Sequence, residues 1–187
     1  MRNQVKLLIS VVIFVILMIY VHVMDKKEFR FSGISTTVIP EDPKKDFKKY
    51  VAFHFAPACR LGNNLFEFSS LIGIAKTLKR IPVVHLEKGM EKMMRRINET
   101  IPGILDQILV INGTVPSTYK NVFFNPRCCV FEDPRVLQAI DSQYLYVDGN
   151  YYQSYKYFPG LRKSLISWMK ISTNFQNLPE SNAKNFM

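Results

Sequence analysis

The sequence predicts an α/β protein with a parallel, Rossmann-like sheet, preceded by a single transmembrane helix. Between residues 50 and 187, short apolar runs rich in β-branched and aromatic residues alternate with segments of helical periodicity. A glycine-asparagine turn joins the first strand-like run to the first helix-like run. A separate apolar run without any charged side chain lies close to the N-terminus.

The N-terminal apolar run, Leu7–Met24, has 18 residues and is long enough to nearly cross a membrane. At about 1.5 Å per residue it approaches the roughly 30 Å thickness of the hydrocarbon layer. Arg2 and Lys6 precede it, which favours a cytoplasmic N-terminus. The alternatives are a cleaved signal peptide, which usually has a shorter apolar region and a small-residue cleavage site, and a buried core helix. We therefore expect a cytoplasmic tail (1–6), a signal anchor (7–24), a flexible stem (25–49) and a partial luminal domain (50–187).

Sequons and cysteines agree with a luminal domain. The triplets that begin at Asn98 and Asn112 predict two N-glycosylation sites. In an oxidising compartment the three cysteines, Cys59, Cys128 and Cys129, would form one disulfide and leave one thiol, or bridge to another chain. Burial as small apolar side chains is an equal alternative.

The formal net charge of +10 raises the question of a nucleic-acid partner. The charges are spread along the chain and mixed in sign, as in "DPKKDFKKY", and "KGMEKMMRR" has the pattern of a solvated helix face. We therefore expect no nucleic-acid binding, and interpret the excess as solvation and attraction to anionic ligands or lipids.

The globular part predicts the following elements in order. A strand at 50–56 alternates large and small residues, and a helix at 64–78 has apolar residues at helical spacing and cations at its end. A strand is expected at 81–86, a helix at 91–101, and irregular turns after it. Strands at 127–132 and 143–149 flank a helix start at Asp133-Pro134. An amphipathic helix at 159–171 places Leu161, Leu165, Trp168 and Met169 on one face.

The turn "RLGNN", from Arg60 to Asn64, enters the first helix after the first strand. Unsatisfied N–H groups at a helix start carry partial positive charge and suit a phosphate. Gly62 allows close approach, Asn63 or Asn64 is a candidate cap, and Arg60 offers a planar cation. Ordinary capping and turn chemistry explain the same residues without any ligand.

Several well-defined signatures are missing from the sequence. It has no dinucleotide or P-loop glycine motif, no zinc-protease or Cys-x-x-Cys motif and no nucleophile elbow. The histidines at 22, 54 and 85 are scattered, and a structural role is expected for each. No Asp-x-Asp triplet is present to hold a divalent ion on a diphosphate, which disfavours a metal-dependent sugar transferase.

Two segments resemble one family. The turn and helix, "RLGNNLFEFSSLIGIAKTLKRIPVV", resemble the "G-R-L-G-N-Q-[ML]-F-[QE]-[YF]" motif of the α-1,2-fucosyltransferases of glycosyltransferase family 11. The segment "YVDGNYYQSYKYF", Tyr146–Phe158, resembles the same family's "L-x-G-Y-[FW]-Q-S-x-K-Y-F" motif. Together they cover about 51–158, and the sequence of the two motifs is most similar to that of divergent members found in nematodes.

The resemblance implies transfer of L-fucose from GDP-fucose to a galactose 2-hydroxyl of a glycan, with inversion, without a metal and without a further cofactor. It implies one half of a GT-B fold and a type II Golgi membrane protein. It places Arg60, Gly62, Asn63 and Asn64 at the donor site, and Tyr152, Gln153 and Ser154 near the acceptor or the cleft. For the last three, packing of an aromatic cluster is the alternative.

The sequence also departs from the family pattern. Asn64 replaces the family's glutamine, and Cys59 replaces a glycine. The family's "H-x-R-R-x-D-Y" motif is absent, so the catalytic residues are unknown and a C-terminally truncated member is expected. Two interpretations share the resemblance: a shortened fucosyltransferase, or an inactive, membrane-anchored Golgi protein that binds a glycan or associates with related transferases. A third interpretation, without the resemblance, is an unrelated luminal α/β binding domain.

Overall fold

The structure is a computed structural model that describes residues 48–87, 89–112, 119–124, 127, 130–149 and 151–173. The expected anchor at 7–24, most of the stem, Cys128 and Cys129 lie outside the described residues. Within the described part of the chain, no helix has the length and hydropathy needed to cross a membrane.

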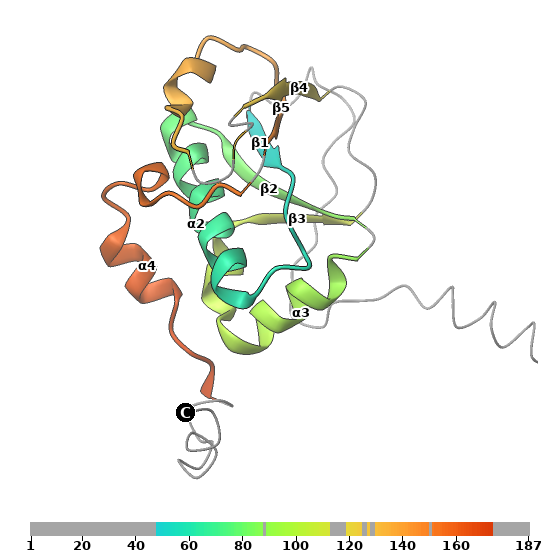
Figure 1. Cartoon of the computed structure of the whole chain (residues 1–187), viewed down its shortest axis with the longest axis vertical. Helices are drawn as coiled ribbons and strands as arrows, with labels where there is room; N and C mark the ends of the chain where they lie inside the picture. The colour runs from blue at the N-terminus through green and yellow to red at the C-terminus, as the bar shows by residue number, and fades with distance from the viewer. Residues whose placement is uncertain are drawn as a thin grey trace, which may run out of the picture. The chain divides into compact units, whose positions relative to one another are not determined.

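A five-stranded sheet forms the centre of the domain, with strand order β3-β2-β1-β5-β4 (Figure 1). All four neighbouring pairs of strands are parallel, which confirms the predicted α/β class with a Rossmann-like sheet. The strands are β1 (Tyr50–Phe53), β2 (Ile81–Leu86), β3 (Leu109–Asn112), β4 (Lys120–Phe123) and β5 (Tyr144–Asp148).

The order of the strands reverses between β1 and β5. From β1 the chain moves outward through β2 to β3, and it then returns to the other side of β1 through β4 and β5. In open parallel sheets the loops at the carboxyl ends of such a pair diverge and leave a crevice in which ligands bind. The carboxyl ends of β1 and β5 are therefore the first place to look for a site.

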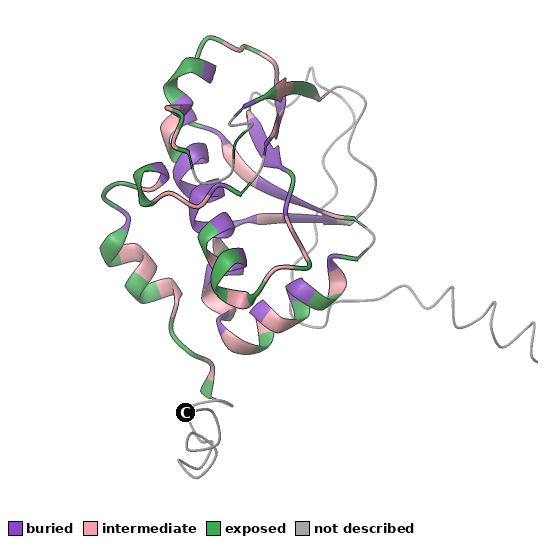
Figure 2. Ribbon diagram, viewed as in Figure 1, coloured by how far each residue is buried: buried purple, intermediate pink, exposed green. Residues whose placement is uncertain are grey.

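In the described part of the chain, three α-helices and three short 3-10 helices accompany the sheet. They are α2 (Leu61–Leu78), α3 (Glu91–Thr100), η1 (Pro102–Gln107), η2 (Pro134–Leu137), η3 (Tyr155–Tyr157) and α4 (Arg162–Trp168). Helix α2 packs on β1 and β2 and also contacts α3, η2 and η3. Figure 2 shows that buried residues occupy most of its length.

Two small residues of α2, Ser70 and Gly73, allow the segment after β5 to pack closely on this helix. Ser70 Oγ donates to the carbonyl of Tyr152 at 2.5 Å, and a Cβ added at Gly73 would collide with the backbone of Tyr157 and Phe158. Large side chains at positions 70 and 73 would hold this segment away from the helix. The segment that follows β5 therefore lies directly against α2.

Arg80 lies at the end of the sheet where the strands begin, which we call the amino edge, and it is 7% exposed. Its Nη1 donates to the carbonyls of Tyr50 at 3.2 Å and Ser142 at 2.7 Å, and its Nη2 donates to Ile140 at 2.6 Å. Nη1 also lies 3.3 Å from the carbonyl of Gln143. One guanidinium thus ties the end of α2 to the starts of β1 and β5.

The sheet face that carries Tyr50 and Tyr144 holds a second core cluster. Its buried members are Tyr50, Ala52, Val83, Ile111 and Tyr144. His85 is buried beside this cluster, and its Nε2 lies 2.8 Å from the hydroxyl of Tyr119. Burial lowers the pKa of His85 to about 4, so the ring is neutral near pH 7, in agreement with the predicted structural role.

Several predicted elements differ from those observed. The helix predicted from Asn64 begins three residues earlier at Leu61, and the last helix is shorter than predicted. The strand predicted at 127–132 is wrong, because residue 127 and residues 130–132 are not in a strand. Phe131 instead packs against Tyr157, with the two ring centroids 5.0 Å apart. The short strands β3 and β4 were not predicted.

Candidate functional site at the carboxyl edge of the sheet

The two sequence motifs leave neighbouring strands at the same edge. In the register of β1 and β5, Phe53 pairs with Val147, so the loops that begin at residues 54 and 149 start side by side. The rings of Phe53 and Tyr152 are 4.4 Å apart. The structure therefore brings together the two segments on which the family resemblance rests.

The start of α2 presents polar residues to solvent. Arg60 occupies the N-cap position in an extended conformation, and Gly62 and Asn63 follow in the first helical turn. All three are exposed, and the first turn contains no acidic residue. No atom lies within 4 Å of the position that a Cβ on Gly62 would take. This helix start has the partial positive charge and the free approach that an anionic group requires.

Asn64 is fully buried, unlike the other three predicted donor residues. Its Nδ2 donates to the carbonyl of Ala56 at 3.1 Å, and its Oδ1 accepts from Arg96 Nη2 at 2.7 Å. The predicted capping role of Asn63 or Asn64 is wrong, because the N-cap residue is Arg60 and no side chain caps the helix. Asn64 instead closes the turn from within, so in this structure it does not line a solvent-facing site.

Glu67 lies beneath the same turn and is 1% exposed. Its Oε2 accepts from the Ala56 N–H and from Asn64 Nδ2, each at 3.4 Å. Burial raises the pKa of Glu67 from 4.5 to about 7, although the hydrogen bonds from Asn64 and Ala56 act in the opposite direction. The hydrogen bonds of this buried carboxyl group go to the turn and to Asn64.

Arg96 joins the turn from α3. Its Nη2 donates to the carbonyl of Cys59 at 2.9 Å as well as to Asn64. Its Nε is buried and has no hydrogen-bond partner among the described residues. The sequence interpretation had placed the "MMRR" stretch on a solvated helix face and missed this contact.

The second motif divides into packed and open residues. Tyr152 is fully buried, and its hydroxyl lies 3.2 Å from the carbonyl of Phe124 and 3.3 Å from that of Val147. Ser154 caps η3 by accepting from the Lys156 N–H at 3.4 Å. Gln153 is half-buried, and its Nε2 has no hydrogen-bond partner in the described part of the chain. Tyr152 thus packs in the core, and a position of the three residues near the acceptor or the cleft stays a prediction.

Tyr151 connects the second motif to the first. Its backbone has φ of 48°, a left-handed conformation that bulky residues adopt rarely and that often marks a constrained site. Its side chain is 38% exposed and hydrogen-bonds Cys59. Cys59, through its charge and this hydrogen bond, raises the pKa of Tyr151. Tyr151 was seen in the sequence only as part of an aromatic cluster.

Other predicted sites are placed without being tested. Asn98 lies on α3 and is half-buried, and Asn112 is the last residue of β3, so glycosylation of both stays a prediction. Among the described residues, no group of three or more His, Cys, Asp or Glu side chains could hold a metal ion.

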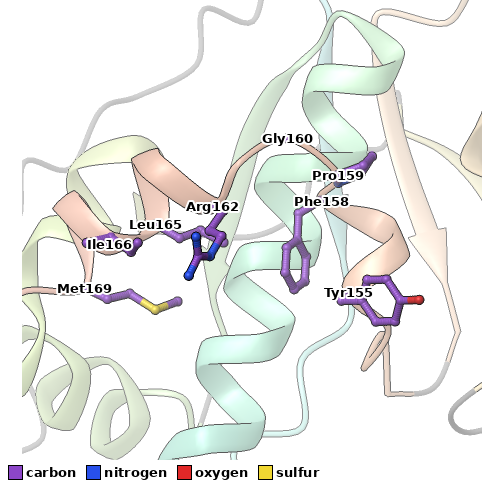
Figure 3. Close-up of a pocket in the computed structure, with 8 residues that line it drawn as sticks. All are labelled: Tyr155, Phe158, Pro159, Gly160, Arg162, Leu165, Ile166 and Met169. Carbon is purple, nitrogen blue, oxygen red and sulfur yellow. The ribbon is translucent and has the colours of Figure 1, made fainter.

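An apolar cavity of about 520 Å³ lies farther along the chain, around η3 and α4 (Figure 3). It is lined by Tyr155, Phe158, Pro159, Gly160, Arg162, Leu165, Ile166 and Met169. Arg162 is the only charged residue in this lining. The cavity is a poor match for a diphosphate, because most of its wall is hydrocarbon.

Comparisons with known proteins agree with the motif assignment. A Caenorhabditis elegans protein named as a candidate galactoside 2-alpha-L-fucosyltransferase, svh-11, is 34% identical over 164 residues, which cover 84% of this chain and 45% of that protein. The chain is a divergent relative of the nematode galactoside 2-alpha-L-fucosyltransferases. The predicted family resemblance is confirmed.

Two further relatives come from the same nematode. A protein named galactoside 2-alpha-L-fucosyltransferase is 26% identical over 166 residues, 87% of this chain and 46% of its own length. Another of that name is 35% identical over 118 residues, 60% of this chain and 29% of its own length. The fucosyltransferase-like chain thus spans less than half the length of these relatives. No family model and no solved structure matches it.

Proposed function

We propose that this domain binds the GDP moiety of GDP-fucose at the turn between β1 and α2, as the donor half of an α-1,2-fucosyltransferase. One observation carries the proposal: both family-like segments meet at the carboxyl edge of the sheet, where the strand order reverses. The names of the relatives supply the sugar and the acceptor class, an L-fucosyl group and a galactoside.

The chemistry available at this turn suits a diphosphate leaving group. When fucose departs to the galactose 2-hydroxyl, negative charge builds on the GDP oxygens. The N–H groups of the first turn of α2 are fixed donors for that charge, and the exposed guanidinium of Arg60 is a cation beside them. Each preorganised donor of this kind contributes about 10²- to 10³-fold to a rate in well-studied enzymes. The fixed donors at this turn offset the charge without any metal ion in the scheme.

The remaining parts of the proposal follow from the sequence. Residues 7–24 anchor the chain in the Golgi membrane, the second half of a GT-B fold completes the cleft, and a galactose-containing glycan approaches past Gln153 and Ser154. Gln153 supports the last point, since its side-chain nitrogen is without a hydrogen-bond partner in the described structure.

Calorimetric titration of GDP into the detergent-solubilised full chain tests the donor site. We expect Arg60→Ala to weaken GDP binding by about tenfold, because one charge-assisted hydrogen bond to a phosphate is lost. Arg162→Ala is the matched control, since it removes an exposed arginine from the apolar cavity and should leave the affinity unchanged. Equal affinities for wild type and Arg60→Ala would contradict the proposed site.

A transfer assay separates the two interpretations that share the family resemblance. Incorporation of fucose from GDP-fucose into a β-galactoside by the full chain would establish a transferase. GDP binding without any transfer would favour the inactive glycan-binding or partner protein. The donor-binding proposal itself depends on the calorimetric result.

A further inference from the structure

Beneath the turn at 54–60 lies a group of three polar side chains, Asn64, Glu67 and Arg96, which we call the turn cluster. Asn64 and Glu67 are buried to 99% or more, and Arg96 is half-buried. Their hydrogen bonds end on one another and on the backbone of the turn: the N–H and carbonyl of Ala56 and the carbonyl of Cys59. The turn cluster therefore shapes the loop from below.

The turn cluster is imperfectly satisfied for a purely structural network. The two hydrogen bonds to Glu67 are long, at 3.4 Å, and Arg96 reaches Asn64 rather than the carboxyl group. The Nε of Arg96 is buried without a partner in the described region. Buried polar groups are nearly always paired in native proteins, so a half-satisfied network at a strand edge points to a functional constraint.

We propose that the turn cluster positions the turn at 54–60 for its anionic ligand, and that Glu67 takes up a proton when that ligand binds. This inference rests on the proposed function, because the ligand in question is the diphosphate of a GDP-sugar. Glu67, Asn64 and Arg96 are positioning residues, since none of them is placed to touch the ligand.

Proton uptake follows from the charges around Glu67. The groups that face it are Asn64 and the Ala56 N–H, which donate to its Oε2, and Tyr151 from the segment after β5, whose pKa the Glu67 charge raises. Arg96 from α3 reaches Asn64 rather than the carboxyl group. With a pKa of about 7, the Glu67 carboxyl is partly ionised near neutral pH. A diphosphate that binds at the turn disfavours the ionised form of Glu67 by like-charge repulsion. Binding therefore raises the fraction of Glu67 that is protonated.

Hydrogen–deuterium exchange of the full chain tests the positioning role without any ligand. In Arg96→Met we expect amides at 54–62 to exchange about tenfold faster, since the tie to the Cys59 carbonyl is lost. Amides of β5 should be unchanged, and Arg96→Lys should restore part of the protection. Wild-type exchange at 54–62 in Arg96→Met would overturn the positioning role. If Arg96→Met fails to fold, Asn64→Ala gives the same comparison.

Calorimetry of GDP binding near pH 7 in two buffers of different ionisation enthalpy tests the proton uptake. Wild type should take up about half a proton more than Glu67→Gln, as expected for a group that titrates near that pH. Wild-type affinity should also fall more steeply than that of Glu67→Gln between about pH 6 and about pH 8, by up to about tenfold. The terminal phosphate of GDP titrates equally with both proteins, so their difference isolates Glu67.

The outcomes separate the two proposals. Equal proton uptake by wild type and Glu67→Gln, with GDP bound by both, overturns the role of Glu67 and leaves the proposed function intact. Absence of GDP binding to wild type overturns the proposed function and the proton uptake together. The exchange experiment decides the positioning role in either case.

Discussion

Arg80 and Arg96 both donate to backbone carbonyls, yet they lie at opposite edges of one sheet. Arg80 binds the starts of strands, and Arg96 binds a turn. Arg80, at the amino edge, is 7% exposed and donates to carbonyls around the starts of β1 and β5. Arg96, at the carboxyl edge, holds a single carbonyl, that of Cys59, together with Asn64. Its Nε remains without a partner among the described residues.

The two edges differ in how fully their polar groups are hydrogen-bonded. The amino edge connects separate elements, and its guanidinium donates to carbonyls before and at the starts of β1 and β5. The carboxyl edge supports a turn, and its polar groups retain unused capacity beside a carboxyl with a shifted pKa. Under the proposed function, we expect stability to depend chiefly on the amino edge, and the response to a ligand on the carboxyl edge.

The largest expected effect comes from breaking the amino edge. Arg80→Met should lower the free energy of unfolding by about 3–5 kcal/mol, because the carbonyls that Arg80 holds lose their donor in a buried place. Chemical denaturation of the full chain measures this loss. Arg96→Met, the matched substitution at the other edge, should cost clearly less. A larger loss at Arg96 than at Arg80 would contradict the proposed division.

A somewhat smaller effect is expected where α2 meets the second motif. Gly73→Ala should cost about 2–3 kcal/mol of stability, because its Cβ would meet the carbonyl of Tyr157 and the backbone of Phe158. Gly62→Ala is the control on the same helix. Its Cβ meets nothing within 4 Å, so it should be neutral or stabilise by up to about 1 kcal/mol through helix propensity. Thermal unfolding of both variants checks the pair, and similar losses in the two would disprove the close packing at Gly73.

The smallest expected effect concerns the pH dependence of stability. The raised pKa of Glu67 means that the folded state binds more protons than the unfolded state between about pH 4.5 and pH 7. Burial of the ionised Glu67 carboxylate therefore lowers the free energy of unfolding above pH 7, and this cost is absent in acid. We expect Glu67→Gln to raise the free energy of unfolding by roughly 1–2 kcal/mol at pH 8 and to leave it unchanged near pH 4.5.

His85 changes the pH dependence of stability in the direction opposite to Glu67. Its pKa is lowered to about 4, so stability falls as the pH drops from 6.5 towards 4. In wild type the two trends oppose each other, and Glu67→Gln should reveal a steeper acid-side decline. Denaturation curves from pH 4.5 to pH 8 measure both slopes. A constant difference between wild type and Glu67→Gln over this range would show that Glu67 does not titrate as described.

Much of the fold could be predicted from the sequence because its signals are local. The apolar run at 81–86 and the alternation around 144–148 are strands as predicted, and 91–100 is a helix. Strand β4 could not be predicted, since "KNVF" is short, begins with two polar residues and is mostly exposed where it pairs with β5. The run "RCCVFE" has strand composition, but its Phe131 ring packs against Tyr157, whose hydroxyl lies 3.4 Å from the carbonyl of Val130.

The candidate site could be predicted only in part, for a related reason. Arg60, Gly62 and Asn63 are exposed at the start of α2, where local turn chemistry suggested them. Glu67 was not singled out, because nothing in the local sequence shows that a carboxyl between Phe66 and Phe68 is buried, although the family motif itself allows glutamate there. Arg96 could not be found from the sequence, because its contact with Cys59 depends on how α3 packs against the turn.

The most direct test is a GDP-dependent exchange footprint of the wild-type full chain. With saturating GDP, we predict slower hydrogen–deuterium exchange at residues 54–63, and a smaller protection at 151–154, because both segments lie at the edge where β1 and β5 end. Protection confined to residues 155–169, which line the apolar cavity, would contradict a nucleotide site at the carboxyl edge of the sheet.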